Sequence, residues 1–474
     1  MTRLTATNRI IGDALTYKPL LGLVNEVVRH RDVGNYDLSC PLYSIKVEHA
    51  SQVQKLLERV GKEPIPPKIK VVSTGYNWGL GSSQASYSPF MVLDCSGIKT
   101  LRQLDDETLE VGPGVTQYEV ASSVVGSRFV PNLTASAPDT SYLGNALARG
   151  VGVRGQKSAD IVSMRVVLPS GEMIDTDNRS TNKRFSTPGY GEGIGPNLKD
   201  LFFQSNLGVV VSANVRLWPK RELEIFRLLF DESQFRDGVR WLEKRLFDRT
   251  LTPVVKVFSP TSRRLQAGNA QGSYTCYATV EGPRYSQLRY FEEVLHDANK
   301  SGHFTDATRL THSPNLTPLE KALLGAWNGK PGHSLEMFAS MFNLASKDID
   351  AQSPLAWRMV LPILPLDGKG LIEIADLIES IAAKYQLDIG FTLNVMSTNC
   401  VDMVICMRFQ RDAASEKRAN SASEELTTLL ERAGVAPYRL DAGTTTWPAT
   451  RDRISLAMEQ AKLKLLFDPR AILL

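Results

Sequence analysis

A glycine-rich loop between two apolar runs constrains the fold of this chain more than any other feature. The loop reads STGYNWGLGSSQ (residues 73–84), and it lies between KIKVV (68–72) and FMVLDCSGI (90–98). Successive glycines allow positive φ, so neighbouring backbone N–H groups can converge on an anion, and the serines and the threonine add hydroxyl donors. Because no GK[ST] follows, this is not the phosphate loop of an NTPase. The pattern favours a strand–loop–strand that holds a pyrophosphate, and a plain glycine-rich hairpin is the alternative.

A second glycine cluster, GNALARGVGVRG (144–155), contains a formal GxGxxG at Gly150, Gly152 and Gly155. A Rossmann fingerprint has to follow a strand and open a helix. Here the glycines follow a helical segment and precede a strand. The order therefore argues against a Rossmann dinucleotide site.

Composition narrows the class of protein. The chain has 474 residues, which predicts two domains or one large domain with an inserted second. Its 55 basic and 51 acidic residues are too balanced to suggest a nucleic-acid partner. No window approaches the roughly 18 apolar residues of a membrane span, and the N-terminus lacks the apolar segment of a secretory signal. Five scattered cysteines without a CxxC pair indicate no zinc or disulfide framework and predict a cytoplasmic protein.

Hydrophobic periodicity divides the chain into two kinds of segment. Residues 43–220 alternate short apolar runs with turn signals, and residues 50–62 have helical spacing. A long polar loop, residues 175–197, is either a lid or a surface excursion. From Arg221 to about Tyr438, longer amphipathic helices such as 370–385 mix with strands and predict a separate α+β unit.

Six short motifs in residues 43–220 follow one order: STGYNWGLGS, VLD, LEVGPGVT, LGNALARGVGV, MRVVLPSGE and LFFQSNLGVV. This series resembles the FAD-binding domain of the vanillyl alcohol oxidase and p-cresol methylhydroxylase family of flavoproteins. The resemblance implies FAD as the cofactor, with the pyrophosphate on the first loop and the flavin beside the GN segment and the glycines after it. The cofactor-binding residues that it implies are Ser73, Gly75, Tyr76, Asn77, Trp78, Gly79, Leu80, Gly81, Ser82, Ser141, Gly144, Asn145, Gly150, Gly152 and Val209.

The second half of the chain resembles the same family. LDIGFTLNVMSTNCVDMVICMRF (387–409) and GVAPYR (434–439) are similar to the end of the cap domain in the branch that oxidises 4-alkylphenols. The implied fold class is α+β: a two-part PCMH-type FAD-binding domain with an inserted α+β substrate cap domain. The implied boundaries are 1–220 and 441–474 for the FAD-binding domain and 221–440 for the cap.

The resemblance also implies a chemistry. Tyr438 and Arg439 match a Tyr-Arg pair that binds the substrate as a phenolate, and they are the predicted catalytic residues. A guanidinium beside a phenol oxygen lowers its pKa and favours hydride transfer to the flavin. The alternative role for Arg439 is an ion pair at a domain junction.

These matches predict an FAD-dependent oxidoreductase that acts on an aromatic alcohol, an alkylphenol or a related natural-product intermediate. Its electron acceptor is O2 or a redox protein, and relatives suggest a homodimer. The alternatives are a dehydrogenase of a 2-hydroxy acid or other alcohol that passes electrons to a protein or quinone, and a flavin-binding protein that has lost catalysis.

Several positions depart from the family. Leu80 stands where a second tyrosine is expected, with Tyr76 or Trp78 as substitutes. After Gly152 the loop is shorter and carries Arg154 and Lys157 where an acid is expected. Either cation could stabilise reduced flavin or bind an acidic substrate, and a solvated surface charge is the alternative. Asp160 is interpreted as the residue that heads the next strand.

The cap segment NCVDMV (399–404) has no histidine or tyrosine that could tether a flavin ring. The first loop has no histidine either. The sequence therefore predicts non-covalent FAD, with Cys400 as the one candidate for an exception.

Overall fold

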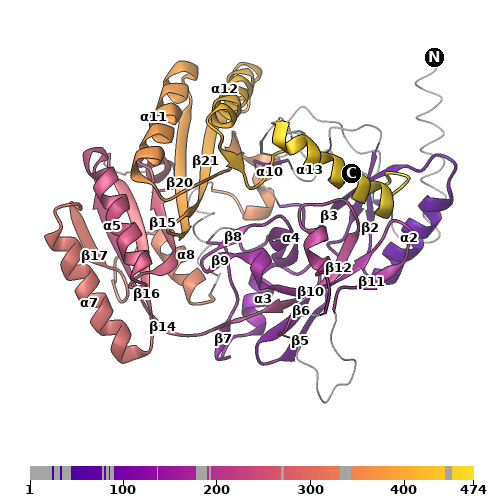
Figure 1. The fold of residues 1–474 in the computed structure, drawn as a ribbon, viewed down its shortest axis with the longest axis horizontal. Helices are drawn as coiled ribbons and strands as arrows, with labels where there is room; N and C mark the ends of the chain where they lie inside the picture. The colour runs from indigo at the N-terminus through magenta and orange to yellow at the C-terminus, as the bar shows by residue number, and fades with distance from the viewer. Residues whose placement is uncertain are drawn as a thin grey trace.

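The computed structural model describes residues 24–25, 33–34, 44–76, 79–81, 85, 90–135, 137–177, 189–191, 194–267, 272–330, 332, 337, 343–442 and 451–474. These residues form an N-terminal unit with two main sheets and two small two-stranded ones, and a second unit around a larger sheet (Figure 1). No helix among them combines the length and the apolar character needed to span a bilayer.

The first sheet carries the glycine-rich loop at the end of one strand. Its order is β1-β2-β4-β3, with β2, β4 and β3 mutually parallel, and β3 (Lys68–Val72) runs into the loop. The predicted helix at 50–62 is confirmed as α2 (Ala50–Lys62), which buries Val53, Leu56, Leu57 and Val60 against this sheet. Each such burial stabilises the fold by about 1.5–3 kcal/mol. The other strands of the sheet are β1 (Val24–Asn25), β2 (Ser44–Lys46) and β4 (Phe90–Asp94).

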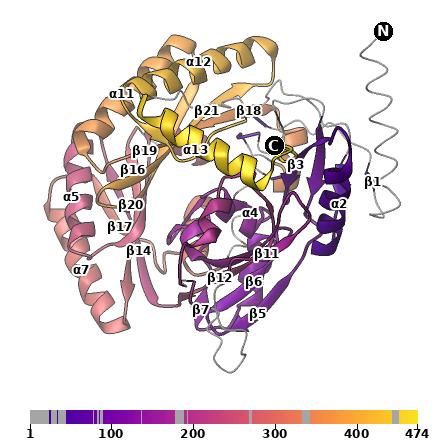
Figure 2. The same ribbon diagram turned by 45° about the vertical axis from the view of Figure 1, so that its right-hand side comes forward.

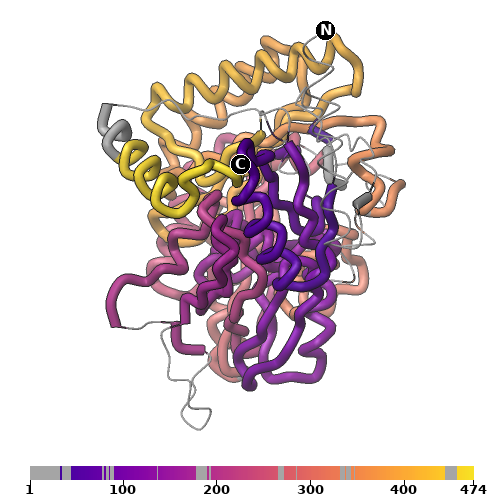
Figure 3. Tube along the Cα trace, turned by 90° about the vertical axis from the view of Figure 1, so that its right-hand side faces the viewer, coloured from indigo at the N-terminus to yellow at the C-terminus, as the bar shows by residue number. Residues whose placement is uncertain are grey.

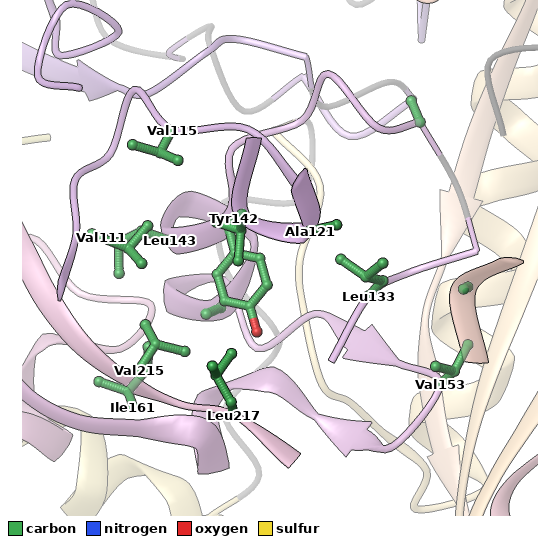
Figure 4. Packing of buried hydrophobic residues seen from close by; sticks show 14 of the residues in the cluster. Val111, Val115, Ala121, Leu133, Tyr142, Leu143, Val153, Ile161, Val215 and Leu217 are labelled. Carbon is green, nitrogen blue, oxygen red and sulfur yellow. The ribbon is translucent and has the colours of Figure 1, made fainter. Parts of the chain in front are cut away.

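The second sheet is antiparallel and has the order β11-β10-β12-β6-β5. Helix α4 (Tyr142–Leu147) packs on it, and Tyr142 lies fully buried at the centre of the shared core (Figure 4). The unit also holds α3 (Gln117–Ser123), β5 (Leu101–Asp105), β6 (Thr108–Val111), β7 (Phe129–Val130), β8 (Val151–Gly152), β9 (Gly155–Gln156), β10 (Ile161–Val167), β11 (Met173–Asp175), β12 (Val209–Arg216) and β13 (Trp218–Pro219).

The C-terminal segment returns to the first sheet. After α13 (Arg451–Phe467), Leu473 forms a parallel bridge with Ile69, and Asp468 accepts the backbone N–H groups of Ile472 and Leu473. Figure 3 shows this end of the chain beside the indigo N-terminal strands. The two-part arrangement and the α+β class are thus present. The boundaries at 220 and 440 stay predictions.

The second unit is built on a nine-stranded sheet of order β17-β14-β16-β15-β20-β21-β19-β22, with β18 paired to β21. Helices α5, α7, α11 and α12 cover its outer face (Figure 2). Its elements are β14 (Glu222–Phe230), α5 (Phe235–Phe247), β15 (Thr252–Phe258), α6 (Pro260–Ala267), β16 (Tyr274–Gly282), α7 (Arg284–Lys300), β17 (Asp306–Arg309), α8 (Pro318–Trp327), α10 (Ile349–Gln352), β18 (Leu355–Val360), β19 (Pro362–Leu364), α11 (Gly368–Tyr385), β20 (Asp388–Ser397), β21 (Cys400–Gln410), α12 (Ala413–Arg432) and β22 (Ala436–Pro437).

Side chains alternate strictly across the middle of this sheet. Val257, Leu393 and Met403 are neighbours in adjacent strands and pack under the outer helices. The next row, Lys256, Asn394 and Asp402, points to the opposite face. That inner face turns toward the N-terminal unit.

Candidate active site

One cavity of about 1140 Å³ lies between the N-terminal unit and the inner face of the nine-stranded sheet. It extends from β3 and the first glycine loop, past α4 and β12, to β15, β20 and β21. This is larger than most sites for small ligands, which suits a cofactor together with a substrate.

The first loop presents backbone to this cavity. Gly75 has φ +79°, and a methyl group built on it would meet no atom within 4 Å. Thr74 Oγ1 accepts a hydrogen bond from the Ser141 N–H at 3.0 Å, which joins the loop to the start of α4. A methyl group at Gly144 would lie 2.4 Å from Ser73 Oγ, so glycine is required for the loop and α4 to meet.

Asn145 continues this wall. Gly150 packs against it so closely that a Cβ at residue 150 would lie 2.3 Å from Asn145 Oδ1. Asn145 Oδ1 is buried and has no hydrogen-bond partner among the described residues. A buried amide oxygen without a donor is costly unless a ligand supplies one. Asn145 therefore marks a place where a bound group would donate a hydrogen bond.

The opposite wall carries a polar row on three adjacent strands. Lys256 Nζ donates to Asn394 Oδ1 at 2.6 Å, and Asn394 Nδ2 donates to Asp402 Oδ2 at 3.2 Å. Burial lowers the pKa of Lys256 to about 8, although Asp402 opposes the shift. Burial also raises the pKa of Asp402 to about 7, against the effects of Asn394, Lys256 and a hydrogen bond with the Tyr438 side chain. The row is therefore poised to gain or lose a proton near neutral pH.

Tyr438 and Arg439 lie at the end of this row, directly after β22. The Tyr438 N–H donates to Leu361 O at 3.0 Å, and Gln204 from the N-terminal unit donates to Tyr438 O at 2.8 Å. Both side chains are only half-buried because they face the cavity. Burial, and then Asp402, raise the pKa of Tyr438 well above its usual value, so its phenol stays protonated as a donor. Burial lowers the pKa of Arg439.

The structure brings most of the predicted site residues into this one cavity. Gly79 and Gly152 do not line the cavity. A Cβ built on Gly79 would lie 2.6 Å from the Trp357 ring, and Gly152 packs against Asn132. Gly81, at φ +61°, also lies outside the lining. Asn77, Trp78 and Ser82 lie outside the described residues, as do 178–188 and 192–193 of the long polar loop. The predicted residues that line the cavity are Ser73, Gly75, Tyr76, Leu80, Ser141, Gly144, Asn145, Gly150, Val209, Tyr438 and Arg439.

Both interpretations of Arg154 and Lys157 are wrong, because neither side chain lines the cavity or lies in solvent. Arg154 forms a buried ion pair with Glu281 at 2.8 Å and donates to Trp327 O at 2.9 Å, so it joins the two units. Lys157 is fully buried, with its Nζ 3.6 Å from the Tyr142 ring centroid. The interpretation of Asp160 is confirmed, since it lies directly before β10.

Sequence reasoning missed Lys256, Asn394 and Asp402 as site residues. The available signal was a lysine, an asparagine or an aspartate inside each of three mainly apolar strand segments: VVKVF, TLNVM and VDMVI. A buried charge in a strand needs a partner or a functional reason.

Comparison with known proteins fits this geometry. A family model described as an FAD binding domain matches residues 41–177. The chain is 25% identical to the 1'-carboxy-chondrochloren decarboxylase of Chondromyces crocatus, over 90% of this chain and 88% of that protein. It is 26% identical to the 4-cresol dehydrogenase [hydroxylating] flavoprotein subunit of Pseudomonas putida, over 90% and 84%. The solved structure of the 4-ethylphenol oxidase from Gulosibacter chungangensis, in an isoeugenol complex, superposes with a TM-score of 0.81 at 18% identity, covering 94% of this chain and 90% of that one.

Residues 41–177 thus match an FAD-binding domain, and the fold is that of the FAD-linked oxidases with a PCMH-type FAD-binding domain. The protein is an FAD-dependent oxidoreductase related to 4-cresol dehydrogenase. The site fits FAD on structural grounds as well: Gly75 with its open surroundings, Asn145 with its orphan amide oxygen, and the hydroxyl-bearing Ser73 and Thr74 all line one large cavity.

Proposed function

We propose that this enzyme removes a hydride from the carbon next to the ring of a phenol-like aromatic alcohol or alkylphenol. Bound FAD supplies the hydride acceptor. The observation that carries the proposal is the position of Tyr438 and Arg439 in the same cavity as the glycine loop and α4. A substrate ring held there would lie between the second unit and the cofactor wall.

The two residues have complementary roles. Arg439 stabilises negative charge on the phenol oxygen, and this charge helps to expel the hydride. Tyr438 keeps its proton, and its hydroxyl, which is hydrogen-bonded to Asp402, would turn from that carboxylate to donate to the same substrate oxygen. The cavity partly encloses both residues, so water screens these interactions less than it would at an open surface.

Asp402 is the candidate proton acceptor. Its Oδ1 is buried and has no hydrogen-bond partner among the described residues, while Asn394 holds Oδ2. With its pKa raised to about 7, the carboxylate can take a proton from the substrate at neutral pH.

Leu80 is a reason not to assign this chain the substrate of a relative. It is buried and lines the cavity, and it cannot donate a hydrogen bond. We therefore expect a specialised substrate rather than vanillyl alcohol itself. A cytoplasmic location, a homodimer and the acceptor O2 belong to the same proposal.

An anaerobic screen tests this function. Holoenzyme mixed with 4-alkylphenols and aryl alcohols should lose its oxidised flavin absorbance, and an aliphatic 2-hydroxy acid should cause no loss. Oxygen consumption with H2O2 formation then separates an oxidase from a dehydrogenase that needs a protein or quinone acceptor. Bleaching by hydroxy acids alone would overturn the phenol assignment in favour of that alternative.

A second candidate reaction is decarboxylation, favoured by the relative from Chondromyces crocatus that matches along 90% of the chain and is named a decarboxylase. Release of CO2 from a carboxylated phenol during flavin bleaching would support it. Bleaching with the carboxyl group retained in the product would exclude it.

A further inference from the structure

Lys256 is a cation in the cavity that the proposed chemistry does not use. Its side chain is 8% exposed and extends from the inner face of β15. Asn394 Oδ1 is the one hydrogen-bond acceptor it has among the described residues. An ammonium group has three donors, so two of them have no acceptor there. Keeping a buried lysine in this state is costly unless something in the cavity compensates its charge.

Asp402 does not compensate Lys256 directly. The Asn394 amide lies between them and bonds to both, and no carboxylate forms an ion pair with Lys256 among the described residues. Lys157, which is fully buried in the N-terminal unit, differs. It lies over the Tyr142 ring in the closed core and makes a 3.3 Å hydrogen bond with Gln117 Oε1. Lys157 therefore has structural partners, whereas the free donors of Lys256 face a cavity.

Two hydroxyl groups extend the polar surface beside Lys256. Thr392 stands on the next inward-facing row of β20, and its Oγ1 lies 3.3 Å from Ser262 Oγ at the start of α6. Both residues line the cavity. An ammonium group with hydroxyl groups one row away provides donors of the kind that a carboxylate accepts.

The distance to the phenol-binding end is set by the sheet. Lys256 and Asp402 are two strands apart in one row, which corresponds to about 10 Å between their backbones. Tyr438 lies beyond Asp402. An aromatic ring with a short acidic side chain can span this interval.

We propose that Lys256 binds a carboxylate on the substrate, so that the enzyme acts on a phenolic acid held at Lys256 by one end and at Tyr438 and Arg439 by the other. This inference rests on the proposed function for the phenol end and adds the second, anionic end. It makes Lys256 a residue that determines specificity.

Anaerobic calorimetric titration of the dithionite-reduced holoenzyme, in which a bound 4-alkylphenol cannot be oxidised, tests the proposal. Three probes differ in one group each: 3-(4-hydroxyphenyl)propanoate, its neutral amide, and 3-phenylpropanoate, which lacks the phenol. The phenolic acid should bind about 10-fold or more tightly than the amide, the difference expected of a charge-assisted hydrogen bond. Lys256→Met should remove that difference and leave amide binding within about twofold, and Lys256→Arg should restore part of it.

Arg264→Gln is the matched control, because Arg264 is an exposed cation on α6 that pairs with Asp388 outside the cavity. It should leave all three affinities unchanged. Equal binding of acid and amide to the unmodified enzyme would overturn the proposal while leaving the phenol site intact. If the two acids bind equally tightly and both lose affinity in Lys256→Met, the phenol contributes nothing to binding. That result would support the carboxylate site and overturn the proposed function. Failure of all three probes to bind would overturn both.

Discussion

Asn394 lies directly opposite Asp402 in the β20–β21 ladder, and its amide donates a hydrogen bond to Asp402 Oδ2. This contact fixes one carboxylate oxygen and leaves Oδ1 buried without a partner among the described residues. The Tyr438 hydroxyl is the other neighbour of this carboxylate, and its hydrogen bond lowers the pKa of Asp402. The position of Asp402 therefore makes the pH dependence of the reaction a direct test of its role.

Asp402→Asn should lower kcat/KM by about 10²–10⁴-fold, the usual effect of removing a general base. In the unmodified enzyme, kcat/KM should rise as the pH passes through about 7, because the base acts only when deprotonated and burial raises its pKa to that value. The variant should lose this rise and keep its FAD. The measurement is kcat/KM across pH 5.5–8.5, and a variant that retains the same inflection would exclude Asp402 as the base.

Arg439→Ala should slow flavin reduction by about 100-fold, since it removes the cation that stabilises the developing phenolate. Arg439→Lys should recover only part of the rate, because an ammonium group lacks the planar fork of donors. Anaerobic stopped-flow absorbance measures the rate, and the flavin spectrum before mixing checks that FAD is bound. An unchanged rate would remove the phenolate assignment but not the fold.

Gly75→Ala should lower FAD affinity by about 10-fold or more, because the loop needs positive φ to turn its N–H groups into the cavity. The strain itself costs about 1–2 kcal/mol of unfolding free energy. Gly126 is the matched control: it has φ +85° and equally open space, but lies outside the cavity lining. Gly126→Ala should show a similar stability cost and normal FAD binding. Equal FAD affinity in the two variants would mean that the loop does not hold the cofactor.

The sequence predicts the side of the cavity formed by the first loop and α4, but not the polar row on the opposite side. The first loop and α4 are local signals: Ser73, Gly75, Gly144 and Asn145 stand within short motifs whose order is specific, and the structure places all of them in one cavity. Lys256 and Asn394 are 138 residues apart and become neighbours only through strand pairing. No local pattern encodes that register, so the polar row could not be assembled from the sequence.

The errors at Arg154 and Lys157 have a related cause. A cation after a glycine turn is usually solvated, and nothing near Arg154 in the sequence indicates that Glu281 will meet it across the two units. For Lys157, the compensating contact is the face of Tyr142. Tertiary packing decided both positions, whereas the predicted helix at 50–62 depended on local periodicity alone and was right.

We predict that the flavin is bound without a covalent link. The cavity-facing side chains of β21 are Asp402, Val404, Cys406 and Arg408, and none is a histidine or tyrosine. Cys400, the candidate exception, lies outside the lining. Burial raises the pKa of the Cys406 thiol to about 11, so little of the nucleophilic thiolate exists at neutral pH.

Acid precipitation of the holoenzyme should therefore leave a colourless pellet and release all the FAD into the supernatant. A yellow pellet would contradict the prediction, and the site of attachment could then be found by comparing Cys406→Ser with Cys400→Ser. Loss of the bound colour in the first variant alone would show that the cavity activates Cys406 despite its burial. The Arg408 guanidinium lowers the pKa of that thiol and would be the group responsible.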